Sequence, residues 1–200
     1  FTMPPGTGPV ACAVGNVRRS ATLTLVKAWV DALAGEAATV TTSGFANEAS
    51  SGSSTADATG NNSTAGAPVT VYAGESATIS EVLSNAGNYL ATLACTGNTI
   101  PLAGNSLTID PADTDITCTQ TNTRRSVTLT LEKQWVNAAI GEQVEVSATG
   151  SFTGTISLDS TADSASEVDA ATAQPVYAGE TITLAESFAD PGNAANYASV

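Results

Sequence analysis

Hydrophobic and polar residues alternate with a period of two along most of this chain, which is the pattern of half-buried β-strands. The clearest stretch runs from 127 to 135, where the even-numbered positions are polar. Its odd-numbered positions are Val127, Leu129, Leu131, Lys133 and Trp135. Positions 23–29 repeat the alternation, and helix signals are weak throughout. The pattern therefore predicts an all-β protein.

Further strands are predicted from the same alternation, and the turn sequences AGE, NAGN and DPAD separate them at short spacing. They are expected at 37–43, 69–72, 76–83, 89–95, 106–109 and 115–122. Together they indicate an antiparallel β-sandwich of seven or eight strands. Two stretches rich in Ser, Gly, Ala and Asn, at 44–67 and 150–173, are predicted as long exposed loops.

The sequence is a tandem repeat. RRSATLTLVKAWV at 18–30 returns as RRSVTLTLEKQWV at 124–136, so every basic residue occurs twice at one fixed spacing. Downstream, VYAGESATISE at 71–81 returns as VYAGETITLAE at 176–186. Chance does not produce matches of this length in the same order, so the chain is expected to consist of repeated domains.

The repeat divides the chain into three predicted parts. ACAVGNVRR at 11–19 matches TCTQTNTRR at 117–125, which indicates that 1–16 is the closing strand of a preceding repeat. Residues 17–123, the first unit, form a complete β-sandwich repeat. Residues 124–200, the second unit, form the following repeat and stop before its last strands. Because the chain opens on Phe1 without a signal peptide, it is expected to be a window of a longer polypeptide.

Composition narrows the function classes. The net charge is −13, aromatic residues make up 5% and charged residues 12%, and His is absent. This is typical of secreted bacterial repeat proteins rather than of cytosolic enzymes, and an acidic surface repels nucleic acid and anionic membranes. No stretch approaches the roughly 20 apolar residues of a membrane span. Since phosphate-binding glycine loops and CxxC motifs are also missing, neither an enzyme nor a cofactor is expected.

Three polar residues of the first unit share a strand face with apolar side chains: Lys27, Glu81 and Asn122. A lone buried ammonium or carboxylate is costly, so these groups should be paired or chemically altered. Burial lowers the pKa of a lysine and favours a protonated glutamic acid, which can polarise an asparagine carbonyl. The set predicts an isopeptide bond from Lys27 to Asn122. A buried Lys27–Glu81 ion pair, or a lysine that reaches solvent, is the alternative.

The order of these residues resembles the prealbumin-like, CnaB-type repeats of bacterial surface adhesins and pili. A Lys in the first strand, the AGESATISE stretch, an Asn-Tyr pair and a terminal TNT carry the resemblance. It implies that Lys27 is linked to Asn122 with the assistance of Glu81. For the second unit it implies Lys133 and Glu186, and for the preceding repeat the acceptor Asn16. The Pro-Gly-Tyr usual after the Glu is here NAGNY at 85–89, which is a departure.

Cysteine usage predicts a disulfide. Cys95 and Cys118 lie in neighbouring strands of one unit, and their bridge would stabilise the fold by about 3 kcal/mol. Cys12 is the equivalent of Cys118 in the preceding repeat, so its partner is expected before Phe1. A disulfide indicates an oxidising compartment, and free buried thiols are the alternative.

Acidic clusters raise the possibility of calcium ligation, because carboxylates are the ligands that this ion prefers. The clusters are Asp110, Asp113 and Asp115, and Asp159, Asp163, Glu167 and Asp169. Neither has the spacing of a known ligand loop, so a solvated acidic surface without metal is the preferred interpretation.

These features predict a structural stalk or filament segment of a bacterial extracellular adhesin or fibre at the cell surface. No flexible linker separates the units, so they should form a stiff rod. Its partners would be neighbouring repeats and laterally associated copies. One alternative is a pilus-type subunit that donates residues 1–16 to a neighbour, although this leaves Cys12 unpaired. Another is glycan or ligand binding by 44–67 and 150–173, which differ between the copies and hold few aromatics.

Overall fold

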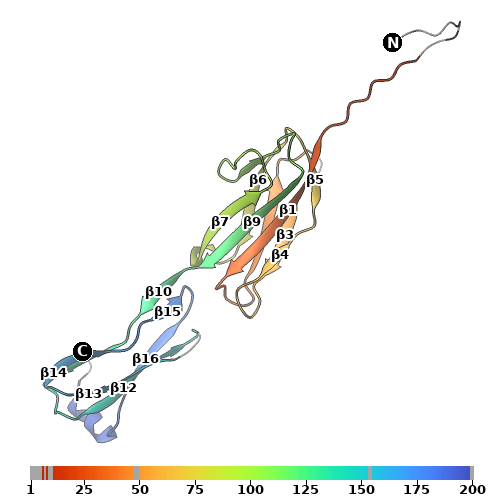
Figure 1. Ribbon diagram of the computed structural model, residues 1–200. Helices are drawn as coiled ribbons and strands as arrows, with labels where there is room; N and C mark the ends of the chain where they lie inside the picture. The colour runs from red at the N-terminus through yellow and green to blue at the C-terminus, as the bar shows by residue number, and fades with distance from the viewer. Residues whose placement is uncertain (1–5, 7, 9–10, 47–49, 153–154, 199–200) are drawn as a thin grey trace.

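The computed structural model describes residues 6, 8, 11–46, 50–152 and 155–198, and nearly all of its regular elements are β-strands (Figure 1). The helical elements in these ranges are two 3-10 segments, η1 (Ala86–Asn88) and η2 (Pro191–Asn196). The all-β prediction is therefore confirmed.

The first unit forms two sheets. One sheet has the order β4-β1-β9-β7, with β5 also paired to β1, and the other has the order β3-β2-β6-β8. The strands are β1 (Ser20–Val30), β2 (Ala37–Ser43), β3 (Ser51–Thr55), β4 (Ser63–Ala65), β5 (Val69–Tyr72), β6 (Ser76–Leu83), β7 (Tyr89–Thr96), β8 (Ser106–Thr108) and β9 (Asp115–Arg124). The six further strands that the alternation predicts are present within two residues of their expected bounds, and the stretch 23–29 lies within β1. The stretch 127–135, predicted as one strand, is divided between two strands of the second unit.

The first and last strands of this unit lie side by side. β1 and β9 pair in parallel over nine positions, from Thr22 opposite Asp115 to Val30 opposite Thr123. The prediction of a purely antiparallel unit was therefore wrong, because alternation shows which side chains face inward but not in which direction a strand runs. The first and last strands of the unit are therefore hydrogen-bonded directly to each other.

The core lies between the two sheets. Leu25 of β1, Val40 of β2, Ile79 of β6 and Ile116 of β9 pack in one buried cluster that draws on both sheets. Each of these side chains stabilises the fold by about 1.5–3 kcal/mol on full burial. In these four strands, the apolar positions of the alternating sequence are therefore the side chains that face the core.

The two stretches predicted as exposed loops contain strands, so that prediction was wrong. The first holds β3 and β4, and the second holds β13 (Ile156–Thr161) and β14 (Ser166–Ala170). In β3 the inward positions are Gly52 and Ser54, whose side chains are too small to produce a hydrophobic signal. A Cβ atom on Gly66 would meet the backbone oxygen of Ser51, so glycine permits the close approach of the chain there.

The second unit repeats the first six strands, with the equivalent of β1 divided in two. It contains β10 (Ser126–Leu129), β11 (Glu132–Val136), β12 (Gln143–Gly150), β13, β14, β15 (Gln174–Tyr177) and β16 (Ile182–Phe188). β10 pairs with β15, β11 pairs with β14, and β12 lies between β13 and β16. Within the described part of the chain no strand corresponds to β7, β8 or β9. Among the described residues, β10 is paired with β15 alone and β11 with β14 alone.

The units are joined by a direct continuation of the chain, since β9 ends at Arg124 and β10 begins at Ser126 (Figure 1). Arg124 donates from Nε to the backbone oxygen of Ala178 at 2.9 Å, and its guanidinium lies 3.3 Å from Glu180. The backbone N–H of Arg125 donates to the oxygen of Asn88 at 2.9 Å. Hydrogen bonds and an ion pair therefore connect residues on the two sides of the joint.

Candidate crosslink site

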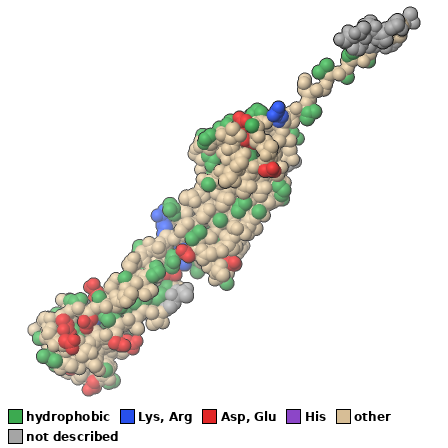
Figure 2. Space-filling view, viewed as in Figure 1, with side chains coloured by type: hydrophobic (Ala, Val, Ile, Leu, Met, Phe, Trp, Pro, Cys, Tyr) green, Lys and Arg blue, Asp and Glu red, His purple; other side chains and the backbone are tan. Residues whose placement is uncertain are grey.

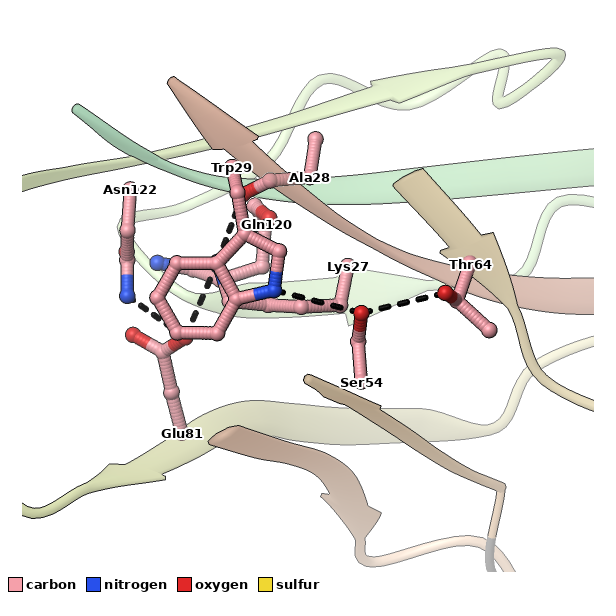
Figure 3. A network of polar contacts seen from close by, with 8 residues as sticks. All are labelled: Lys27, Ala28, Trp29, Ser54, Thr64, Glu81, Gln120 and Asn122. Carbon is pink, nitrogen blue, oxygen red and sulfur yellow. Dashed lines mark hydrogen bonds and ion pairs between the residues drawn. The ribbon is translucent and has the colours of Figure 1, made fainter. Parts of the chain in front are cut away.

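The structure brings Lys27, Glu81 and Asn122 together in the interior of the first unit (Figure 3). Lys27 and Asn122 come from the neighbouring strands β1 and β9, and Glu81 comes from β6 in the facing sheet. The Nζ atom of Lys27 lies 3.5 Å from Oε1 of Glu81. The same oxygen accepts a hydrogen bond from Nδ2 of Asn122 at 2.9 Å. One carboxylate therefore bridges the amine and the amide.

Lys27 and Asn122 are fully buried, and the Glu81 side chain is 12% exposed. The ammonium of Lys27 donates to the backbone oxygen of Ala28 at 2.6 Å and lies 3.9 Å from the centre of the Trp29 ring. Burial lowers the pKa of Lys27, and the nearby Glu81 offsets only part of that effect. The alternative in which Lys27 reaches solvent is therefore wrong for this structure.

The amide of Asn122 is only half satisfied. Its Oδ1 atom is buried and has no hydrogen-bond partner among the described residues. An unpaired buried carbonyl costs about 1–3 kcal/mol. A carbonyl without a donor, an amine with a lowered pKa and a carboxyl group are thus held together in the buried interior. The amine and the carboxamide are the reactants of amide exchange, and the carboxyl group can transfer protons between them.

Trp29 and its neighbours complete the site, and sequence reasoning missed them. The Trp29 ring covers Lys27, and its Nε1 donates to Oγ of Ser54 at 3.2 Å. Ser54 in turn donates to Thr64 at 3.0 Å. Both hydroxyl residues lie in the stretch that was predicted to be an exposed loop. The sequence signal that could have revealed Trp29 is the Trp that stands two residues after the lysine in both units, at 29 and 135.

The second unit contains an open version of this site. Lys133 Nζ lies 2.6 Å from Oε1 of Glu186, but the two side chains are 15% and 32% exposed. Trp135 again covers the lysine, at 4.4 Å from its ring centre, and again donates to a serine, Ser160, at 2.7 Å. No asparagine corresponding to Asn122 is present in the described ranges. Asn16, the other predicted acceptor, is exposed before β1 and is not brought to either lysine.

The predicted disulfide is present between Cys95 of β7 and Cys118 of β9. The two residues are opposite each other in the antiparallel pair β7–β9. Cys12 is a free and exposed cysteine. Strand β9 is therefore covalently joined to β7 on one side, and on its other side it pairs with β1, which carries Lys27.

The acidic residues of the two predicted clusters do not gather around a common point, and Asp113 instead accepts hydrogen bonds from the backbone. Within the described residues no group of three or more His, Cys, Asp or Glu side chains could hold a metal ion. Asp113 accepts from the backbone N–H of Thr99 at 2.7 Å and of Asp110 at 2.8 Å. Although burial acts to raise the pKa of Asp113, these hydrogen bonds outweigh it and the pKa is lowered. Figure 2 shows acidic side chains scattered over the visible face, most of them on the second unit.

Comparison with known proteins leaves the family open. No protein-family model and no curated protein matches the chain. Among solved structures, a leucine-rich repeat protein from Bacteroides thetaiotaomicron is similar at 13% identity, with a TM-score of 0.25. The match covers 82% of this chain and 21% of that protein. None of the helices in the described ranges is long and apolar enough to cross a membrane.

Proposed function

We propose that this chain is a load-bearing segment of the stalk of a bacterial extracellular adhesin or fibre, built from tandem β-sandwich domains arranged as a rod. The observation that carries the proposal is the buried Lys27–Glu81–Asn122 set, which spans the first and last strands of the first unit. A covalent bond between Lys27 and Asn122 would join β1, where force enters the unit, to β9, where force leaves it.

The strand arrangement supports a mechanical role. When the two ends of the first unit are pulled apart, force acts at the start of β1 and at the end of β9. Because these strands run in parallel, those points lie at opposite ends of the pair. The load is then spread along all nine paired positions rather than concentrated on one hydrogen bond at a time. A unit built this way resists stretching along its long axis.

A covalent bond would add to that resistance. Transfer of a proton from the Lys27 ammonium to the carboxylate of Glu81, 3.5 Å away, leaves a neutral amine and a carboxylic acid. The amine attacks the side-chain carbonyl carbon of Asn122, the bond from that carbon to Nδ2 breaks, and ammonia leaves. A half-turn of the Asn122 amide exchanges its oxygen and nitrogen, so that a protonated Glu81 can donate to the carbonyl oxygen and relay protons to the leaving group. One amine and one amide give one new amide and one ammonia, and no oxidant or metal is consumed.

The disulfide and the joint between the units support the same proposal. The Cys95–Cys118 bond ties β9 to β7 and is stable in the oxidising conditions outside the cytoplasm. At the joint, the buried Arg124–Glu180 pair and the bond from Arg125 to Asn88 restrict bending. The stretches 44–67 and 150–173 contain strands that pair within the sheets, which favours the stalk over the ligand-binding alternative.

Single-molecule stretching between the two chain ends tests this function. With a Lys27–Asn122 bond, force bypasses the residues between the two linked positions, so the first unit should release only a short length of chain. Lys27→Arg should restore full extension of that unit, apart from the loop that the disulfide closes. The matched control Lys133→Arg should leave the extension of the first unit unchanged. Full extension of the native first unit at low force would contradict the proposal.

A further inference from the structure

The joint between the two units is open on one side and in contact on the other. Strand β9 reaches the joint between β1 and β7, because Val30 of β1 and Leu90 of β7 both lie opposite Thr123 (Figure 1). The chain that follows β1 and the residues that precede β7 therefore flank the connection on opposite sides. The second unit meets these two flanks in different ways.

On the β1 side a cleft of about 490 Å³ separates the units. Apolar side chains line both of its walls: Ala32, Leu33 and Ala58 of the first unit, and Phe152, Ile156 and Pro175 of the second. Leu33, Ala58 and Pro175 are exposed. The charged residues that line the cleft are Asp31 and the pair Arg124 and Glu180. Closure of the cleft would remove apolar surface on both walls from water, so the hydrophobic effect favours movement in this direction.

On the β7 side the units touch through Asn88 and Gly179. A Cβ atom on Gly179 would lie 3.0 Å from Nδ2 of Asn88, so the amide of Asn88 rests close to the backbone of the second unit. Asn88 belongs to η1, directly before β7. Rotation of the second unit toward β7 would press its backbone against this side chain, so movement in that direction is blocked.

Two arginines hold the connection between the open side and the contact side. The guanidinium of Arg124 pairs with Glu180 and donates to the backbone oxygen of Ala178 in the second unit. The backbone oxygen of Arg125 accepts from the N–H of Ala178 at 2.8 Å, and its side-chain Nε donates to the backbone oxygen of Tyr89 at 3.2 Å. Arg125 is therefore bonded to both units at the point where the chain passes between them.

The contacts of these arginines occur twice in the chain. Arg18 lies 3.1 Å from Glu75 and donates to the backbone oxygen of Ala73 at 2.8 Å. The backbone oxygen of Arg19 accepts from the N–H of Ala73 at 3.0 Å. The arrangement is therefore a feature of the repeat rather than of one joint alone.

We propose that the joint is a hinge that bends in one direction, toward the β1 side, where bending closes the cleft. Arg124 and Arg125 act as the pivot, because their bonds lie at the connection itself. Asn88 against Gly179 is the stop for the opposite direction. Tension along the chain opposes closure, whereas a sideways force on the β1 side closes the cleft. This inference goes beyond the proposed stalk function and does not depend on the bond between Lys27 and Asn122.

Distances between spin labels on the two walls of the cleft test the inference. Labels at Ala58→Cys and Gln174→Cys are suitable, because both positions are exposed and line opposite walls. All variants carry Cys12→Ser, so only the introduced thiols are labelled. A pair within the first unit, Ala58→Cys with Ser80→Cys, gives the width of a distance distribution without a hinge. In pulsed electron paramagnetic resonance, the pair across the cleft should give a wider distribution, with a tail toward short distances and a sharp limit at long distances.

Two further substitutions, made in the chain labelled across the cleft, test the stop. Asn88→Ala removes the side chain that rests against Gly179, so the distribution should extend beyond its former limit at long distances. Asn85→Ala is the matched control and should leave the distribution unchanged, because Asn85 lies next to η1 but donates to Glu36 of its own unit.

A distribution across the cleft as narrow as the one within the first unit would show a rigid joint and overturn the inference. A native chain that spreads toward both shorter and longer distances would show a free linker, which also contradicts it. Equal effects of Asn88→Ala and Asn85→Ala would eliminate the stop.

Discussion

The two units contain the same lysine, glutamate and tryptophan but differ in what surrounds them. In the first unit β9 lies against β1, and Lys27 is fully buried beside Glu81 and Asn122. In the second unit the described strands leave that position open, and Lys133 and Glu186 are a partly solvated ion pair. The comparison shows that the repeat sequence supplies the charged pair, while the closing strand supplies the dry environment and the amide.

Removal of the glutamate from each unit should produce the largest difference in stability loss between the two units. Glu81→Ala leaves the Lys27 ammonium without its ionic partner in a closed interior, and breaking a buried pair costs about 3–5 kcal/mol. Glu186→Ala should cost less than about 1 kcal/mol, because the pair in the second unit is partly exposed. Hydrogen exchange, resolved by peptide, measures the two units separately in one sample. Equal losses in both units would show that the closing strand does not change the environment of the lysine.

Apolar side chains at equivalent positions of β6 and β16 should show a similar contrast in their contribution to stability. Ile79→Ala is expected to cost about 2–5 kcal/mol, because it leaves a cavity in the packed core of the first unit. Leu184→Ala at the equivalent position should change stability by less than about 0.5 kcal/mol, since the side chain is largely exposed. Peptide-resolved hydrogen exchange measures both changes. A large loss for Leu184→Ala would mean that the apolar face of the second unit is already covered.

The disulfide adds a further asymmetry. Replacement of both Cys95 and Cys118 by serine should destabilise the first unit by about 3 kcal/mol, because the bridge restricts the unfolded chain. The second unit should keep its stability, since the described residues give it no equivalent bridge. Chemical denaturation followed by peptide-resolved exchange separates the two units. Cys12→Ser is the matched control and should leave both units unchanged.

Acid should lower the stability of the first unit through protonation of Asp113. The pKa of this residue is lower in the folded chain than its ordinary value of 3.8, so the folded state binds its proton less readily than the unfolded state. The resulting stability is fully present above the ordinary value and is lost as pH falls through the lower, folded value. Asp113→Asn should remove this pH dependence. Unfolding free energies at several pH values below 5, measured for both chains, provide the check.

Much of the first unit could be predicted from its sequence, because its inward faces carry large apolar side chains. The strands with Leu25, Ile79 and Ile116 fall into this group, and so does the candidate site, since Lys27 and Glu81 interrupt apolar faces. The strands with Gly52 and Ser54 inside could not be found this way. Small side chains pack where two strands approach closely, and they leave no hydrophobic signal along the sequence.

Two further features depended on the tertiary arrangement. The parallel pairing of β1 with β9 could not be predicted, because the direction of a strand is set by the path of the chain and not by its alternation. The bridge that Glu81 forms between Lys27 and Asn122 required three strands from two sheets to meet at one depth. The sequence indicated which residues belong inside, but only the fold determined which of them are neighbours.

Intact-mass measurement of the purified chain tests the central claim most directly. A chain with a bond from Lys27 to Asn122 should be lighter than its sequence mass by one ammonia, after allowance for the disulfide. Proteolysis should then yield one branched peptide that contains both residues, while Lys133 remains unmodified as an internal control. The Glu81→Gln chain should retain the ammonia. A native chain at its full sequence mass, with the Lys27 and Asn122 peptides separate, would contradict the account.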